Sequence, residues 1–292
     1  KDTVLAAQTP THRSEALIKD GEKYFIKYLM SGFYVDVKGW ATASDTPVHQ
    51  FSFSGDTNQM FVANYHDSTS DDGGGYFNFT PAHATSKRLS FNYGLFQTDG
   101  DCVLKNPTNS IYQRFKITYL EDGKYRVMTG ASDYAKILRS ASNASGSNAY
   151  DLRQLICELA FNPNSINHYW SFERIVDLSS SATSFTQGFK SNEFYRIAAS
   201  SSGTRTFTST NSSLNFFEIG YRTGTGNSTY TRTGNSTTST QDFSASITSG
   251  RIYYLKVNNK DVILPASNTS LTSNIDIGLK DEIYVRLLPP SK

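Results

Sequence analysis

Four side chains in the first quarter of the chain could together hold a ligand that carries adjacent hydroxyl groups. The carboxylate Asp36 is followed by the aromatic Phe51 and then by two neighbouring amides, Asn58 and Gln59. A carboxylate accepts charge-assisted hydrogen bonds from two adjacent hydroxyls, an amide supplies a donor and an acceptor, and an aromatic face covers a patch of C–H groups. A sugar ring requires this combination of groups.

Two further residues extend this candidate site. His49 lies two positions before Phe51 and adds a ring with two nitrogen atoms. Trp40 follows Gly39, in a predicted loop, and has two possible roles: an accessory platform for a ligand, or packing over the end of a strand.

Asp36 and Gln59 each have a structural alternative to a ligand contact. Asp36 lies between Val35 and Val37, and strand alternation turns it to the face opposite those two apolar side chains. It is therefore either a ligand contact or an exposed strand carboxylate. Gln59 belongs to a repeated triplet, and such residues more often hold a fold than touch a ligand.

The triplet that contains Gln59 occurs three times, at nearly equal intervals along the chain. It reads Gln59-Met60-Phe61, Gln113-Arg114-Phe115 and His168-Tyr169-Trp170. A nearly fixed period of this length predicts a repeated structural unit.

A turn signal repeats with the triplet. Asp-Gly occurs at residues 20–21, 72–73 and 122–123. Glycine accepts a positive φ without steric cost, so Asp-Gly favours a tight turn. Short strands are predicted directly afterwards, at residues 24–27, 76–79 and 125–128.

Three units of about 50 residues, each with about four short strands, fill residues 20–176. Such units could form a three-bladed propeller or a three-lobed barrel, and propellers typically have four or more blades. We therefore predict a β-trefoil. Its centre should be a threefold stack of apolar residues: Val48, Cys102, Cys157, Phe61, Phe115 and Trp170.

Cys102 and Cys157 are separated by the same interval as the second and third triplets. Each lies as far before its own triplet as Val48 lies before the first. Because this position is apolar in every repeat, we predict two buried thiols rather than a disulfide.

The first repeat resembles one repeat of the ricin B-chain type β-trefoil lectins. The resemblance rests on residues 32–39 (GFYVDVKG), residues 46–51 (TPVHQF) and residues 58–61 (NQMF). That family has a Gln-x-Trp triplet in each repeat. Here two triplets have Phe in place of Trp, and the third has His in place of Gln. The match covers residues 20–176.

The resemblance implies a carbohydrate-binding function with glycans as partners, galactose-type sugars among them. Asp36, Phe51, Asn58 and Gln59 match the acid, the stacking ring and the amide pair of the family in type and order. His49 stands where the family usually has Gln, and the ring of Phe51 is smaller than the Trp often found there.

The other two repeats lack this set. Counting back from each triplet by the interval that separates Gln59 from Asp36 gives Ser90 and Ser145. Counting back by the interval that separates Gln59 from Phe51 gives Lys105 and Ala160. We therefore expect one sugar site, in the first repeat.

The polar run at residues 177–185 predicts a boundary between a trefoil domain at 1–178 and a second domain at 186–292. Alternating segments at intervals of about ten residues favour a β-sandwich. The order of strands and turns in this part resembles that of the small jelly-roll-like domains found C-terminal to secreted bacterial peptidases. Residues 192–197, 243–257 and 284–287 carry this resemblance. The expected strands lie at residues 194–199, 204–210, 214–221, 243–247, 252–257 and 283–288.

Residues 223–249 have a competing interpretation. Long alternations of small polar and apolar residues form the membrane hairpins of β-pore-forming toxins. A lectin-type pore-forming toxin is therefore an alternative, with a membrane as its partner. The glycines at 224, 226 and 234 interrupt the alternation and argue against it.

Composition excludes several other classes. Aromatic residues make up 13% of the 292 residues and charged residues only 18%, which favours an all-β fold. The net charge of +2 gives no basis for binding nucleic acid. No metal-ligand spacing, phosphate loop or Gly-x-Ser-x-Gly motif is present, so we expect no metal, no cofactor and no enzyme activity.

The sequence therefore predicts an all-β, secreted or extracellular protein, with a β-trefoil followed by a jelly-roll-like β-sandwich. It would be a lectin, or the targeting region of a larger exoenzyme or toxin. The second alternative is a protein-interaction or structural module without sugar binding, because trefoils also serve in that way. No apolar stretch approaches the roughly 18 residues of a membrane-spanning helix, and residues 1–5 do not resemble the apolar core of a signal peptide.

Overall fold

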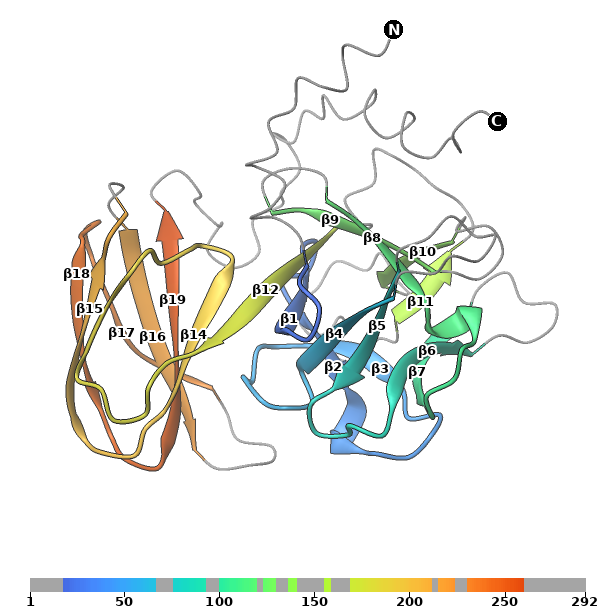
Figure 1. The fold of residues 1–292 in the computed structure, drawn as a ribbon, viewed down its shortest axis with the longest axis horizontal. Coiled ribbons are helices and arrows are strands. Elements are labelled where there is room, and N and C mark those ends of the chain that lie inside the picture. The colour runs from blue at the N-terminus through green and yellow to red at the C-terminus, as the bar shows by residue number, and fades with distance from the viewer. Residues whose placement is uncertain are drawn as a thin grey trace, which may run out of the picture.

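The computed structural model describes residues 18–66, 76–92, 100–119, 123–129, 136–140, 155–158, 169–211, 215–223 and 230–259. These residues form two β-rich lobes joined by strand β12 (Figure 1). Two short 3₁₀ turns, η1 (Lys38–Trp40) and η2 (Ile111–Gln113), accompany the strands of the first lobe.

The first lobe contains three repeats of four strands. The first repeat comprises β1 (Lys23–Tyr28), β2 (Tyr34–Val37), β3 (Val48–Phe51) and β4 (Met60–His66). The second comprises β5 (Tyr76–Pro81), β6 (Arg88–Asn92), β7 (Gly100–Lys105) and β8 (Phe115–Tyr119). The third comprises β9 (Tyr125–Thr129), β10 (Lys136–Ser140), β11 (Leu155–Glu158) and β12 (Trp170–Asp177).

The outer strands of each repeat close a six-stranded barrel in the order β1, β4, β5, β8, β9, β12, with β12 pairing back onto β1. The inner strands of each repeat form the hairpins β2–β3, β6–β7 and β10–β11. Strands β3, β7 and β11 of these hairpins contact one another. A six-stranded barrel with three hairpins is the β-trefoil, so the prediction from the repeat period is confirmed.

The centre of the trefoil holds the apolar residues that the repeats predict. Val48, Cys102 and the triplet aromatics Phe61, Phe115 and Trp170 are all at most 1% exposed. Cys102 carries a buried thiol. Cys157 lies in β11 opposite Leu138, as Cys102 lies in β7 opposite Phe91, and its side chain lies outside the described part.

The triplet glutamines hold the loop that precedes them. Gln59 donates from Nε2 to the carbonyl oxygen of Ser52 (2.9 Å) and accepts at Oε1 from the amide of Ser54 (2.9 Å). Gln113 makes the same two bonds with residues at the same offsets, Asn106 (2.8 Å) and Thr108 (2.9 Å). The glutamine of the triplet is therefore part of the trefoil framework. His168, the third member, lies outside the described residues.

Replacing Gln113 by Leu should lower the free energy of unfolding by about 2 kcal/mol, because the two backbone groups that Gln113 holds lose their partners. Urea denaturation measures this loss, and sugar binding should not change. Gln241→Leu is the control, since Gln241 is exposed and makes one long bond of 3.4 Å to a carbonyl oxygen. A Gln113→Leu variant as stable as the control would contradict the framework role.

The second lobe is built from two sheets. Strand β12 pairs in parallel with β14 (Glu193–Ala198), and the sheet continues through β19 (Arg251–Asn259) and β16 (Asn215–Thr223) to β17 (Thr231–Asn235). The other sheet contains β13 (Ser184–Gln187), β15 (Gly203–Ser209) and β18 (Asp242–Ile247). Figure 1 shows the two sheets as neighbouring layers.

A separate apolar core fills the space between these sheets. Its members come from strands of both, with the ring of Phe207 in β15 near that of Phe189, and Phe189 near Phe217 in β16. The jelly-roll resemblance stays a prediction, and the expected strand at residues 283–288 lies outside the described residues. Strand β13 begins inside the segment at 177–185 where we expected only a boundary, and its Phe185 joins this core.

The segment considered for membrane hairpins is divided between the two sheets. Strand β17 pairs with β16 in one sheet, and β18 pairs with β15 in the other. These two strands would have to leave different sheets before they could pair as a membrane hairpin. The described arrangement therefore gives no support to the pore-forming alternative.

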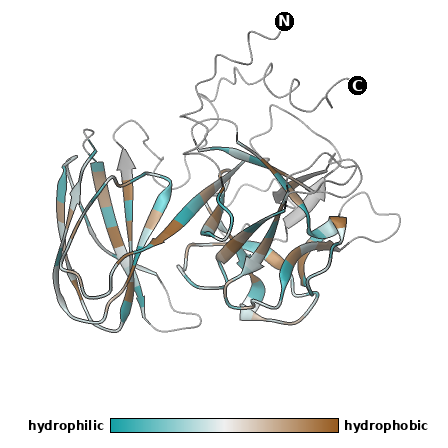
Figure 2. Cartoon of the chain, viewed as in Figure 1, coloured by the Kyte–Doolittle hydropathy of each residue, from teal (hydrophilic) through white to brown (hydrophobic). Residues whose placement is uncertain are grey.

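A third apolar cluster, separate from both lobe cores, lies where the two lobes meet. Phe25 of β1 makes edge contacts with Phe194 of β14 (5.1 Å between ring centroids) and Tyr254 of β19 (5.6 Å). Tyr34, Met60 and Ile175 complete the buried set. Strand β12, which runs between the lobes, carries hydrophobic positions along its length (Figure 2). The two lobes thus meet through an aromatic cluster of their own.

A buried charged network accompanies this cluster. Glu173 of β12 is 4% exposed, and it accepts from Lys256 Nζ (2.6 Å) and from the hydroxyl of Tyr34 (2.7 Å). Burial alone would raise the pKa of Glu173, but Lys256, Lys27 and the two hydrogen bonds together hold the pKa below its ordinary value. Burial and the neighbouring Lys256 lower the pKa of Lys27.

The depressed pKa of Glu173 predicts a loss of stability in acid. Its contribution is present above the ordinary glutamate pKa of about 4.3 and is lost as the pH falls through the lower folded-state pKa. The slope of unfolding free energy against pH below about 4.3 should therefore be shallower in Glu173→Gln than in the native chain. Urea denaturation at several pH values measures both slopes, and equal slopes would contradict this assignment.

Candidate functional site

Asp36 lies in the middle of β2, opposite His49 of β3. It is 4% exposed, and all four residues of β2 are buried. The alternative of an exposed strand carboxylate is therefore wrong. The side of β2 that carries Asp36 faces the loop at residues 52–59, whose amide side chains reach Asp36.

Three side-chain donors hold the carboxylate of Asp36. His49 Nε2 lies 2.9 Å from Oδ1, and Oδ2 accepts from Asn58 Nδ2 and Gln59 Nε2, both at 3.0 Å. Asn58 also donates to the carbonyl oxygen of Val37 (3.1 Å). An ionised carboxylate offers about four acceptor positions. This geometry therefore leaves roughly one of them for a further donor.

Two polar atoms beside this carboxylate are buried and have no partner among the residues described: His49 Nδ1 and Asn58 Oδ1. Because His49 Nε2 faces a carboxylate oxygen, we assign the proton to Nε2, which leaves Nδ1 as an acceptor in the neutral ring. Buried polar atoms are nearly always hydrogen-bonded. Each is an acceptor that still lacks a donor among the described residues.

The two aromatic candidates have different surroundings. The half-buried ring of Phe51 is stacked near that of His49, with 5.9 Å between centroids and 18° between planes, so it borders the cluster. Trp40 instead packs edge-on against His83, with 5.6 Å between centroids. This contact matches the packing alternative for Trp40. The structure thus joins Asp36, His49, Phe51, Asn58 and Gln59, and places the described ring contact of Trp40 elsewhere.

The second and third repeats carry different residues in the same register. Ser90 takes the place of Asp36 and pairs with Val103, and Lys105 takes the place of Phe51. In the third repeat, Ile137 pairs with Glu158 as Asp36 pairs with His49. The predicted equivalence of Ser145 with Asp36 is therefore wrong, because the third repeat has a longer connection between its two hairpin strands. Ser145 and Ala160 lie outside the described residues.

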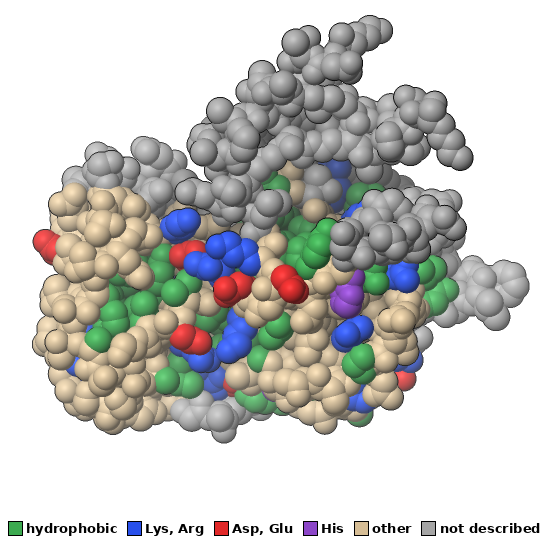
Figure 3. Space-filling view, viewed as in Figure 1, with side chains coloured by type: hydrophobic (Ala, Val, Ile, Leu, Met, Phe, Trp, Pro, Cys, Tyr) green, Lys and Arg blue, Asp and Glu red, His purple; other side chains and the backbone are tan. Residues whose placement is uncertain are grey.

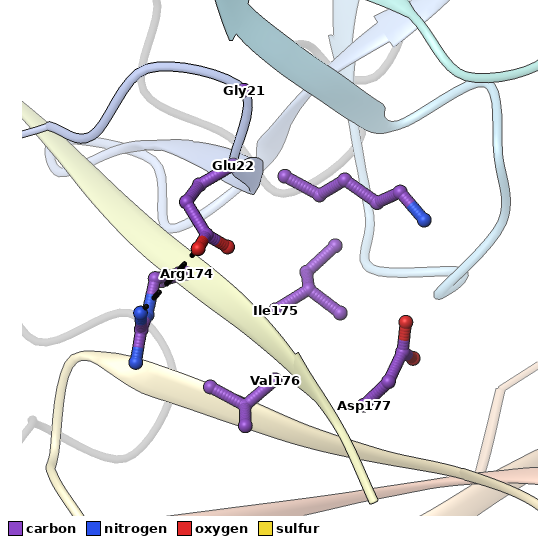
Figure 4. A pocket seen from close by; sticks show the side chains of 7 residues that line it. Gly21, Glu22, Arg174, Ile175, Val176 and Asp177 are labelled. Atoms are coloured by element: carbon purple, nitrogen blue, oxygen red, sulfur yellow. Dashed lines mark ion pairs between the residues drawn. The ribbon is translucent and has the colours of Figure 1, made fainter.

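A groove between the start of β1 and the end of β12 is separate from this cluster. It has a volume of about 310 Å³ and lies beside Arg174, which forms ion pairs with Glu193 (2.6 Å) and Glu22 (3.8 Å; Figure 4). Charged side chains of both signs gather there (Figure 3). Its lining residues are Gly21, Glu22, Lys23, Arg174, Ile175, Val176 and Asp177, none of which was a predicted site residue.

Within the described ranges, no group of three or more His, Cys, Asp or Glu side chains could hold a metal ion. The same residues include no helix long and apolar enough to cross a membrane.

The described part of the chain is a β-trefoil joined to a second β lobe, and its first repeat contains the polar cluster around Asp36. No protein-family model and no curated protein matches the sequence. Among solved structures, the chain is similar to a designed threefold-symmetric protein, ThreeFoil, at 20% identity over 51% of this chain and 96% of that one, with a TM-score of 0.42.

Two natural proteins show similar levels of likeness. A mosquitocidal holotoxin matches at 15% identity over 78% of this chain, with a TM-score of 0.46, and this chain spans 23% of the holotoxin. A Macrolepiota procera ricin B-like lectin, solved in complex with lactose, matches at 12% identity over 54% of this chain and 99% of the lectin, with a TM-score of 0.40.

Proposed function

We propose that this chain binds carbohydrate through one site in the first trefoil repeat. The carrying observation is that the Asp36 carboxylate is fixed by three donors beside two buried polar atoms that have no partner in the described part of the chain. A ligand with adjacent hydroxyls would complete this arrangement, since each hydroxyl both donates and accepts.

Each residue has a definite role in this proposal. Asp36 accepts a hydrogen bond from one ligand hydroxyl. The Oδ1 atom of Asn58 accepts a hydrogen bond from the adjacent ligand hydroxyl. His49 holds the carboxylate through Nε2 and accepts at Nδ1. Gln59 orients Asp36 while fixing its own loop. Phe51, half-buried at the edge of the cluster, covers the apolar face of the sugar ring.

We place the chain among secreted lectins, or as the targeting region of a larger secreted exoenzyme or toxin, without enzyme activity of its own. Galactose-type sugars are the first ligands to test, because vicinal hydroxyls with an apolar face opposite suit the acid, the amide and the ring. A single site of this size should give millimolar to micromolar affinity.

A glycan array followed by titration calorimetry tests the proposal. Binding to one class of galactose-, xylose- or mannose-containing glycan is expected, with one site per chain. An absence of binding across all three series would contradict it.

A second candidate function is a protein-interaction or structural module. The burial of Asp36 favours it, because the side chains of Asp36 and His49 are each only 6% exposed. In that case the cluster stabilises the hairpin and the loop without a ligand. The same array separates the two candidates, since only the lectin should respond to sugar.

A further inference from the structure

The loop that carries the amides of the cluster is covered in the first repeat and open in the second. Gly55, Asp56 and Asn58 are buried. The corresponding residues of the second repeat are Asn109, Ser110 and Tyr112, of which Asn109 and Tyr112 are exposed and Ser110 is half-buried. The two loops share the same glutamine framework, so the difference arises from what packs on the first loop.

Arg222 of β16 provides the first part of this cover. Its guanidinium contacts both carboxylate oxygens of Asp56, and the two side chains are each 2% exposed. Asp56 Oδ1 also accepts from the backbone amide of Thr57 (2.7 Å). A planar guanidinium that binds both oxygens of a carboxylate fixes its orientation as well as its position.

Tyr254 of β19 provides the second part. Its hydroxyl donates to the carbonyl oxygen of Gly55 (2.7 Å), which Arg222 Nη1 also approaches (3.4 Å). Gly55 has φ +66°, and a Cβ atom there would lie 2.6 Å from the Tyr254 ring. The close approach of the second lobe therefore requires glycine at this position.

An aromatic contact anchors the start of the same loop. The ring of Phe53 is stacked on Phe194 of β14, with 4.9 Å between centroids and 19° between planes. Tyr230 and Tyr254 meet the same ring edge-on, at 4.9 and 5.8 Å. Residues 53, 55 and 56 are thus all held by the second lobe.

This hold is transmitted directly to the donors of Asp36. Asn58 follows Asp56 by two positions, and the amide of Gln59 donates to the carbonyl oxygen of Asp56 (2.9 Å). The amide of Val37, next to Asp36, donates to the carbonyl oxygen of Asn58 (3.1 Å). A shift of Asp56 therefore moves both amides that bind the carboxylate.

We infer that Arg222 and Tyr254 are positioning residues for the Asp36 site, so that the second lobe forms part of the sugar-binding apparatus rather than a separate appendage. The expected effect on sugar affinity rests on the proposed function, because it requires that the Asp36 site binds sugar. Its structural part, that the second lobe holds the amide-bearing loop in place, stands on the contacts alone.

The test uses Arg222→Met and Tyr254→Phe in the full chain, with titration of the glycan that the native chain binds best. Arg222→Met removes a charge-assisted pair, so affinity should fall about tenfold or more. Tyr254→Phe keeps the ring and removes the hydroxyl that binds the carbonyl oxygen of Gly55, so affinity should fall about two- to tenfold even if Arg222→Met does not fold. Arg232→Met is the matched control, because Arg232 pairs with Glu218 at an exposed position of the second lobe.

Amide hydrogen exchange supplies a readout that needs no sugar. In both variants the amides of Val37 and Gln59 should exchange faster than in the native chain, while the amide of Gln113, at the equivalent place in the second repeat, should not change. Unchanged exchange at Val37 and Gln59 would overturn the inference, as would unchanged affinity in both variants. If the native chain binds no glycan, the proposed function fails and the exchange result alone decides whether the second lobe holds the loop.

Discussion

The variant Asp36→Asn is expected to bind the preferred glycan of the native chain about a hundredfold more weakly, because hydrogen bonds to a charged acceptor contribute about 1.5–3 kcal/mol each. The substitution keeps the shape of the side chain and removes its charge. It also places an NH₂ group against donors that now face a carboxylate oxygen: His49 Nε2 on one side, and the amides of Asn58 and Gln59 on the other. The free energy of unfolding should fall by about 2 kcal/mol for the same reason.

Asp45→Asn is the control for this prediction. Asp45 lies in the same repeat and forms an ion pair with Lys105, but its side chain is 53% exposed. Asparagine also tolerates its positive φ of 65°. Titration calorimetry should show unchanged binding for the control and nearly abolished binding for Asp36→Asn. If Asp36→Asn bound the glycan with full affinity, Asp36 would not be a ligand contact.

The variant Glu173→Ala should have the largest effect on stability, a loss of about 3–5 kcal/mol. Glu173 is the buried carboxylate that Lys256 and the Tyr34 hydroxyl contact, and it also lowers the cost of the neighbouring Lys27 charge. Removing it leaves two lysines close together at the junction of the lobes without their shared counter-charge. The penalty comes from uncompensated buried charge rather than from lost packing area.

Two comparisons isolate this cause. Asp177→Ala breaks the pair with Arg196, in which the Asp177 side chain is 51% exposed, and should cost at most about 1 kcal/mol. The double variant Glu173→Met with Lys256→Met replaces the ion pair by apolar side chains and should recover much of the loss. Urea denaturation followed by tryptophan fluorescence measures all three variants. Equal stability of Glu173→Ala and Asp177→Ala would show that the network does not join the lobes.

The trefoil could be predicted from the sequence because the sequence pattern of its repeat unit occurs three times. The triplets, the Asp-Gly turns and the apolar position before each triplet locate most of the strands. Periodicity also located the long strands β14, β16 and β19. It missed β13 and β17, whose Ser- and Thr-rich sequences look like the loops around them.

The cluster around Asp36 could be predicted in type but not in environment. Its members lie on two paired strands and the following loop, so order along one repeat was enough to collect them. Burial could not be read from strand alternation, because the loop at residues 52–59 and the second lobe cover the polar face of β2. The Asp56–Arg222 pair joins residues 166 positions apart, and one sequence carries no signal for it.

Counting along the chain also failed where repeats differ in length. The rule that relates Asp36 to Gln59 places Ser90 correctly, since the first two repeats have equal spacing. In the third repeat it points to Ser145, whereas strand pairing puts Ile137 at that place. Register in a hairpin is set by the turn and by the hydrophobic pattern, not by distance from a later motif.

A crystal structure of the native chain soaked with its best-bound glycan tests the central claim most directly. We expect one sugar ring beside Phe51, with hydroxyls hydrogen-bonded to Asp36, to Asn58 Oδ1 and to His49 Nδ1, the two atoms that now have no described partner. A sugar bound elsewhere, for example in the groove beside Arg174, with those two atoms still unpartnered, would contradict the account.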